Sequence, residues 1–182
     1  MAIFLAVLSG LGVILMALQE LAGIRRTRER RSAGSEWAAR RRQALAVRPE
    51  DVGPLGKADD AYGVLMEVGT PSTTLTLAAF ADGKASLYSS AGGEVLDGHG
   101  HEQVRTAALA LVAEADVHRR TMKRVGHCPK PGHGNVRFNV MSGRGMFAAE
   151  EDEEALDNGW SPLARLYEAG VKTMQALREL PA

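Results

Sequence analysis

The pattern of apolar and polar positions divides the 182-residue chain into an apolar start, a basic stretch and a longer mixed segment. Residues 1–18 contain nothing more polar than Ser9, and apolar residues resume at Leu21 after Gln19 and Glu20. At about 1.5 Å per residue, a helix of roughly 20 residues crosses a hydrocarbon core of about 30 Å. We therefore predict a single transmembrane helix over residues 1–24, with the lipid bilayer as its partner.

The charges that follow the apolar run indicate its orientation. Five arginines follow within seven positions: Arg25, Arg26, Arg28, Arg30 and Arg31. Such clusters stay on the cytoplasmic side, so we expect a single-pass protein of the bacterial inner membrane with its C-terminal domain in the cytoplasm. The alternatives are a cleaved signal peptide, which lacks its basic n-region here, a buried helix, or a later start at Met16 or Met66.

Residues 25–57 form a basic linker in this interpretation. Three arginines occupy residues 40–42, with Trp37 and Leu45 nearby, and prolines and glycines follow from Pro49 onward. We favour a solvated tether that sets the topology. The alternative is an amphipathic helix that lies along an anionic membrane surface.

Residues 58–182 are predicted to be one α+β domain. Short apolar or alternating runs predict strands over 62–68, 73–81 and 84–90, with Asp82-Gly83 as a type I′ hairpin signal, and a second hairpin over 136–148. Apolar residues at helical spacing predict helices over 102–123 and from Ser161-Pro162 onward. The order βββ-α-ββ-α favours a small antiparallel sheet covered on one face by two helices. By analogy, this order is similar to the profilin and roadblock folds, which serve as interaction platforms.

Charge argues against a nucleic-acid-binding module, and the cysteine content excludes a small secreted domain held by intramolecular disulfides. Nine Arg and four Glu lie in residues 1–50, whereas thirteen basic and eighteen acidic residues follow. A nucleic-acid-binding module would carry its basic residues on the folded domain, so we expect no nucleic-acid partner. Cys128 is the only cysteine, which excludes an intramolecular disulfide.

Several sequence blocks resemble a group of bacterial proteins to which no activity is assigned. The blocks are YGVLM at 62–66, ADG at 81–83, SLY at 86–88, AGG at 91–93 and HExVR at 101–105. The resemblance covers roughly residues 61–115 and, loosely, the hairpin around Phe138. It implies no activity, cofactor or catalytic residue for this chain.

The glycine-rich segment 91–102 is the strongest candidate for a ligand site. Free backbone N–H groups before a helix can bind an anion. The candidate ligand-binding residues are Gly92, Gly93, Gly98, His99, Gly100, His101 and Glu102. The segment matches neither the P-loop nor the dinucleotide fingerprint. We therefore favour a tight turn in which the glycines supply positive φ angles.

Other reactive residues form weaker patterns. His99, His101 and Glu102, or His127, Cys128 and His133, have metal-ligating side chains without the spacing of a known zinc motif, and we predict no metal and no cofactor. Cys128 beside His127 lacks an orienting third residue, so we predict no catalytic nucleophile. The acidic run 150–154 favours a solvated loop, with a docking patch for a basic partner as the alternative.

These patterns favour a non-catalytic interaction or regulatory module held at a membrane, with a protein partner or a second copy of the chain as its ligand. The alternative is a small-ligand-binding or enzymatic domain that uses the glycine-rich loop 91–102. No nucleophile, base and orienting residue can be named together, which favours the first hypothesis.

Overall fold

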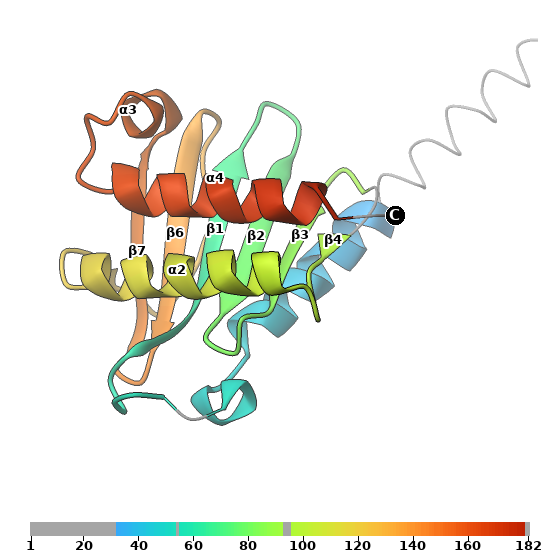
Figure 1. The fold of residues 1–182 in the computed structure, drawn as a ribbon. Coiled ribbons are helices and arrows are strands. Elements are labelled where there is room, and N and C mark those ends of the chain that lie inside the picture. Colours follow the sequence, from blue (N-terminus) through green and yellow to red (C-terminus); the bar gives the residue numbers. More distant parts are fainter. Residues whose placement is uncertain (1–31, 54, 93–95, 181–182) are drawn as a thin grey trace, which may run out of the picture.

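The computed structural model describes residues 32–53, 55–92 and 96–180, and the predicted anchor 1–24 lies outside them. Within these residues the chain forms an antiparallel seven-stranded sheet in the order β4-β3-β2-β1-β6-β7-β5 (Figure 1). The elements after residue 48 are η1 (Pro49–Val52), β1 (Ala61–Gly69), β2 (Thr74–Phe80), β3 (Ala85–Ser89), β4 (Leu96–Asp97), α2 (Glu102–Arg119), β5 (Lys123–Arg124), β6 (Asn135–Ser142), β7 (Gly145–Asp152), α3 (Glu153–Asp157) and α4 (Ala164–Arg178). Residues 32–45 form a further helix, called the 32–45 helix below. The α+β class is confirmed.

The predicted strands and hairpins are present because their apolar residues alternate with the period of a strand. Strand β1 is buried along its whole length since it pairs with β2 and β6 and is covered on both faces. The turn between β2 and β3 is not type I′, because only Gly83, at φ 83°, has a positive φ there. A type I turn followed by a left-handed glycine makes the same connection.

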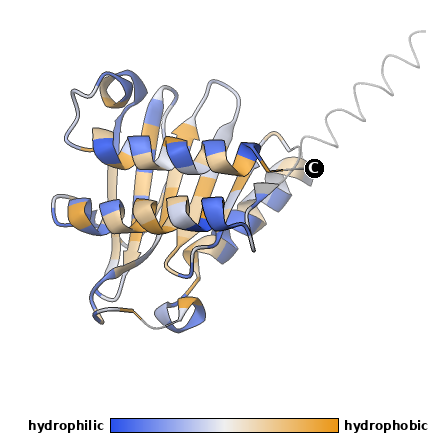
Figure 2. Cartoon of the chain, in the orientation of Figure 1, coloured by the Kyte–Doolittle hydropathy of each residue, from blue (hydrophilic) through white to orange (hydrophobic). Residues whose placement is uncertain are grey.

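Helices α2 and α4 cover one face of the sheet (Figure 1). Val104, Ala108 and Leu111 of α2 are fully buried, as are Leu166 and Leu177 of α4. Figure 2 shows a mixture of hydrophilic and apolar positions on the outward sides of these two helices. Helix α4 begins at Ala164 and not at the predicted Ser161-Pro162 start, because the Ser161 hydroxyl accepts a hydrogen bond from the Leu163 amide in a preceding turn.

The 32–45 helix covers the opposite face, so the prediction of a sheet covered on one face only is wrong. Trp37 and Ala44 of this helix pack against Leu65, Tyr88 and Met141 of the sheet. A solvated tether therefore does not describe this part of the basic segment. The folded domain extends upstream of residue 58, because apolar residues of the helix are buried on the sheet and the partly buried Arg41 is bonded to it.

Two further differences concern charged and apolar segments. The acidic run is ordered structure and not a loop, since residues 150–152 end β7 and Glu153 begins α3. Asp152 caps α3, and its carboxylate accepts a hydrogen bond from the Ala155 amide. Among residues 32–53, 55–92 and 96–180, no helix has the length and apolar character needed to cross a membrane.

Candidate functional site

The described part of the glycine-rich loop forms a turn between β4 and α2. Gly98 is buried, and a Cβ atom there would lie 2.2 Å from Cγ1 of Val104 and 2.9 Å from Cδ2 of Leu177. Gly100 has a φ of 84°, with open space around it. Close packing therefore requires glycine at one position, and backbone conformation favours it at the other.

The polar side chains of this loop do not converge on a cavity. His99, His101 and Glu102 are exposed, and the carboxylate of Asp97 accepts a hydrogen bond from the His99 amide. Gly92 is partly buried beside Ala33, and Gly93 lies outside the described residues. Within the part of the chain that the structure describes, the loop geometry is explained by packing and turn formation.

A groove of about 660 Å³ between the outer sides of α2 and α4 includes Glu102 at one end. Its lining is partly small and apolar, with Ala107, Ala110 and Ala169, and Lys172 beside it forms an ion pair with Glu168. The Thr106 hydroxyl in this lining donates a long hydrogen bond, of 3.5 Å, to the Glu102 carboxylate. The groove offers a surface for contact.

The metal-ligating residues remain apart in the structure. Among the described residues, no three His, Cys, Asp or Glu side chains are grouped closely enough to hold a metal ion. The two candidate sets, around His101 and around Cys128, are not grouped into such a centre among these residues.

Cys128 lies in a partly buried position in the loop between β5 and β6. Burial raises the pKa of its thiol above the ordinary value, and the nearby Arg41 and Arg137 offset this only in part. We expect iodoacetamide at pH 7.5 to alkylate Cys128 more slowly in the folded protein than in the urea-unfolded protein, because less thiolate is present and access is limited. Mass spectrometry measures the rate of alkylation. A faster rate in the folded protein than in the unfolded protein would indicate an activated thiolate.

A row of polar side chains crosses the sheet on the face covered by the 32–45 helix. The residues are directly opposite one another on successive strands, from β3 through β2, β1 and β6 to β7. This polar row consists of Tyr88, Thr76, Glu67, Arg137 and Glu150. Polar side chains in the centre of a sheet must be paired to offset the cost of their desolvation.

Glu67 is the centre of the row and is fully buried. Arg41 of the 32–45 helix donates two hydrogen bonds of 2.7 Å, from Nε to Oε1 and from Nη2 to Oε2 of Glu67. The carboxylate also accepts hydrogen bonds from the Thr76 hydroxyl at 3.3 Å and from the Asn139 amide at 3.1 Å. This bidentate geometry is the strongest form of an arginine–carboxylate pair. The hydrogen bonds to Glu67 raise the pKa of Arg41, so the guanidinium stays charged.

The loop between β5 and β6 also contacts Arg41 and Trp37 of the 32–45 helix. Arg41 Nη2 also donates to the carbonyl oxygen of Cys128, at 2.8 Å. Trp37 donates from its ring nitrogen to Thr76 at 3.0 Å, and the Lys130 ammonium lies 4.5 Å from the centre of its ring. The helix, the loop and the sheet are thus joined through buried polar contacts in addition to apolar ones.

The β7 end of the row is a second ion pair, Arg137–Glu150, and Asn139 links it to Glu67 by accepting a hydrogen bond from Arg137 and donating one to Glu67. Glu150 accepts hydrogen bonds from Arg137, Asn135 and the Gly132 amide, at 3.0 to 3.1 Å. Burial acts to raise the pKa of Glu150, but these three hydrogen bonds together lower it. At the β3 end, the buried Tyr88 hydroxyl has no hydrogen-bond partner among the described residues.

The polar row and Arg41 were not predicted as a site. Glu67 is a charged residue inside the apolar run YGVLMEV, and this is the one signal in the sequence that a buried partner exists. Its partner, Arg41, lies 26 residues upstream in a run of three arginines that resembles a solvated basic cluster. Only the position of the helix on the sheet distinguishes Arg41 from its neighbours.

Comparisons with known proteins give no assignment, since no protein-family model, curated protein or solved structure matches the chain significantly. A proposal for the function must therefore rest on the arrangement of the described residues.

Proposed function

We propose that this chain is a non-catalytic interaction or regulatory module, held at the cytoplasmic face of a bacterial membrane by residues 1–24. The observation that carries the proposal is the attachment of the 32–45 helix to the sheet through the Arg41–Glu67 pair. Seven residues separate the described part of this helix from the predicted anchor. A domain bound to its own juxtamembrane helix would be held close to the membrane in a limited range of orientations.

The division of the arginines supports this arrangement. Arg41 is used inside the fold, with its side chain 12% exposed, whereas Arg40 beside it is 44% exposed. The five arginines of residues 25–31 precede the helix. Arginines next to an anionic leaflet each contribute about 1 kcal/mol of attraction. Residues 25–31 would therefore contact the membrane surface while Arg41 holds the domain.

The chemistry of the described residues also favours a module without catalysis. Glu67 is saturated by four donors from Arg41, Thr76 and Asn139, and is closed to solvent. The thiol of Cys128 has a raised pKa, which disfavours its action as a nucleophile. The analogy with the profilin and roadblock folds supports an interaction platform at the level of architecture. A protein partner or a second copy of the chain would be its ligand.

Membrane extraction of the full-length chain tests this proposal. We expect the protein to stay in the membrane pellet after a sodium carbonate wash of bacterial membranes. The matched control is the double variant Ile14→Arg/Leu15→Arg, which leaves the domain unchanged and adds about 5 to 7 kcal/mol to the cost of insertion. This variant is expected in the soluble fraction.

Protease access tests the orientation. Trypsin should digest the domain in inverted inner-membrane vesicles and leave it intact in spheroplasts. Recovery of the wild-type chain in the soluble fraction, or digestion from outside the spheroplasts, would contradict the proposal.

A further inference from the structure

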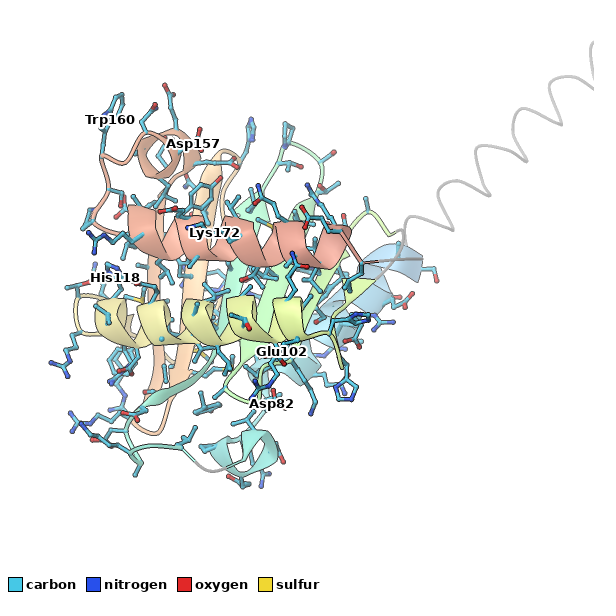
Figure 3. All side chains as sticks on the ribbon, in the orientation of Figure 1. Asp82, Glu102, His118, Asp157, Trp160 and Lys172 are labelled. Carbon is cyan, nitrogen blue, oxygen red and sulfur yellow. The ribbon has the colours of Figure 1, made fainter. Side chains whose placement is uncertain are left out.

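The end of the molecule formed by α3 and the loop to α4 presents an exposed tryptophan. Trp160 is 76% exposed, although the other tryptophan, Trp37, is 3% exposed. Figure 3 shows Trp160 and Asp157 at this end of the molecule, near the beginning of α4. Exposure of a large aromatic side chain to water is energetically unfavourable. Such residues often contribute most of the binding free energy in protein–protein interfaces.

The backbone on either side of Trp160 is fixed. The amides of Trp160 and Ser161 both donate to the carbonyl oxygen of Ala155, at 2.9 and 3.2 Å. Leu156 before the loop and Leu163 after it are buried, at 2% and 3% exposed. The tryptophan is thus presented from an ordered loop, which lowers the entropy lost when a partner binds.

A hollow of about 400 Å³ with a mixed apolar and charged lining lies between α3 and α4, next to this loop. Leu156, Ala164, Tyr167 and Val171 supply its apolar lining, and Gly159 lies at its edge. The hollow is large enough for one bulky apolar side chain of a partner. Trp160 and the hollow together form a contact surface with an aromatic group and a pocket.

The charges around this surface are almost all negative. Five carboxylates form no ion pair with a basic side chain of the described residues: Glu151, Asp152, Glu153, Glu154 and Asp157. Arg165 is the basic residue in the lining of the hollow. The pKa of Tyr167 is raised to about 12 by burial and by the charges of Glu153 and Asp157. A cationic partner would be attracted here, and an anionic one repelled.

The same end of the molecule lies away from the start of the 32–45 helix. Ala33 lies beside Gly92, just after β3, whereas α3 directly follows β7. Strands β2, β1 and β6 lie between β3 and β7 in the sheet (Figure 1). Four strand spacings correspond to about 19 Å. A domain anchored through the 32–45 helix would leave the Trp160 surface free.

We propose that Trp160 and the hollow between α3 and α4 are the docking site for a basic segment of a partner protein. The segment offers one large apolar side chain to the hollow and Lys or Arg side chains to the acidic residues. The site rests on the proposed function, because it names the kind of partner that the interaction module binds.

Binding of defined peptides to the full-length chain in detergent tests the site. The probe is a fluorescein-labelled peptide with central Phe and Leu residues between lysines. One comparison peptide keeps the lysines and replaces Phe and Leu by Ser, and a second keeps Phe and Leu and replaces the lysines by Glu. We expect the first peptide to bind, measured by fluorescence anisotropy, and to protect Trp160 from quenching by acrylamide. Neither comparison peptide should bind comparably.

Variants locate the binding on the surface. Trp160→Ala is expected to weaken binding by about tenfold or more, as for an interface hot spot. Glu154→Gln/Asp157→Asn is expected to weaken it at low salt and to have less effect at high salt. The matched controls are Val117→Ala, an exposed apolar residue on α2, and Glu50→Gln, an exposed carboxylate in η1. Both controls should bind as the wild type does.

Three results would overturn the docking site. If Trp160→Ala bound the peptide with unchanged affinity, the binding site would lie elsewhere on the protein. If the Ser-containing peptide bound equally well, charge attraction would account for the binding without the hollow. Stronger binding of a peptide copied from residues 25–36 would assign the surface to a second copy of this chain. Carbonate extraction reports the membrane proposal independently, since the substitutions at residues 154, 157 and 160 leave residues 1–24 unchanged.

Discussion

Replacement of Arg41 by Met is expected to lower the free energy of unfolding by about 3 to 5 kcal/mol, because it leaves the buried carboxylate of Glu67 without its charged partner. Glu67 is 0% exposed, and Thr76 and Asn139 would be its remaining donors. Urea denaturation of the detergent-solubilised chain, followed by circular dichroism, measures the loss. It should be among the largest effects of any single substitution in the 32–45 helix.

Two further variants separate the ion pair from general damage to the helix. Arg40→Met changes the neighbouring arginine, whose exposed pair with Glu36 should contribute less than about 1 kcal/mol. The double variant Arg41→Met/Glu67→Gln removes the buried charge and should recover part of the stability. Equal losses for Arg40→Met and Arg41→Met would show that the buried pair does not hold the helix.

Replacement of Gly98 by Ala is expected to destabilise the protein by about 3 kcal/mol, the upper end of the usual cost of overpacking. The added Cβ would overlap Val104 at the start of α2 and crowd Leu177 of α4. Gly100→Ala is the matched control, since only its positive φ opposes a side chain, at a cost of about 1 to 2 kcal/mol. Thermal unfolding of both variants gives the comparison.

The same pair of variants tests the alternative function of the loop. A stable Gly98→Ala protein that had lost a bound small molecule, detected by native mass spectrometry, would make the glycine-rich loop a ligand site. Loss of stability with no such molecule in the wild-type protein would support the turn.

Features that depend on local spacing could be predicted from the sequence. The alternation in residues 73–81 and 136–141 depends only on the period of a strand, and both segments are strands. The helix from Glu102 was predicted for the same reason, since Val104, Ala108 and Leu111 lie on one side of it. Local periodicity survives in the fold wherever one face of an element is buried.

Features that depend on contacts distant in the sequence could not be predicted. The 32–45 helix has only two large apolar residues, Trp37 and Leu45, and its burial depends on Trp37, Ala44 and Arg41 matching a sheet that forms later in the chain. Strands β4 and β5 have two residues each and no periodicity to detect. The acidic residues 150–152 were predicted to be a loop, because charged side chains usually face solvent. In the structure Glu150 forms an ion pair with Arg137 on the neighbouring strand.

The candidate site divides in the same way. Gly98 and Gly100 were recognised from composition, and the structure gives each of them a reason that does not require a ligand. Trp160 lies between Gly159 and Ser161-Pro162, outside any regular apolar pattern. The sequence therefore does not indicate whether its side chain is buried or exposed. Its exposure becomes visible only when Leu156 and Leu163 on either side are seen to be buried.

Hydrogen exchange of the full-length chain in lipid vesicles tests most directly whether the domain is bound to its juxtamembrane helix. We expect the amides of residues 32–45 to exchange as slowly as those of α2, and Arg41→Met to accelerate exchange in the 32–45 helix first. Exchange of residues 32–45 at the rate of an unprotected chain, while β1 and β6 remain protected, would contradict this expectation.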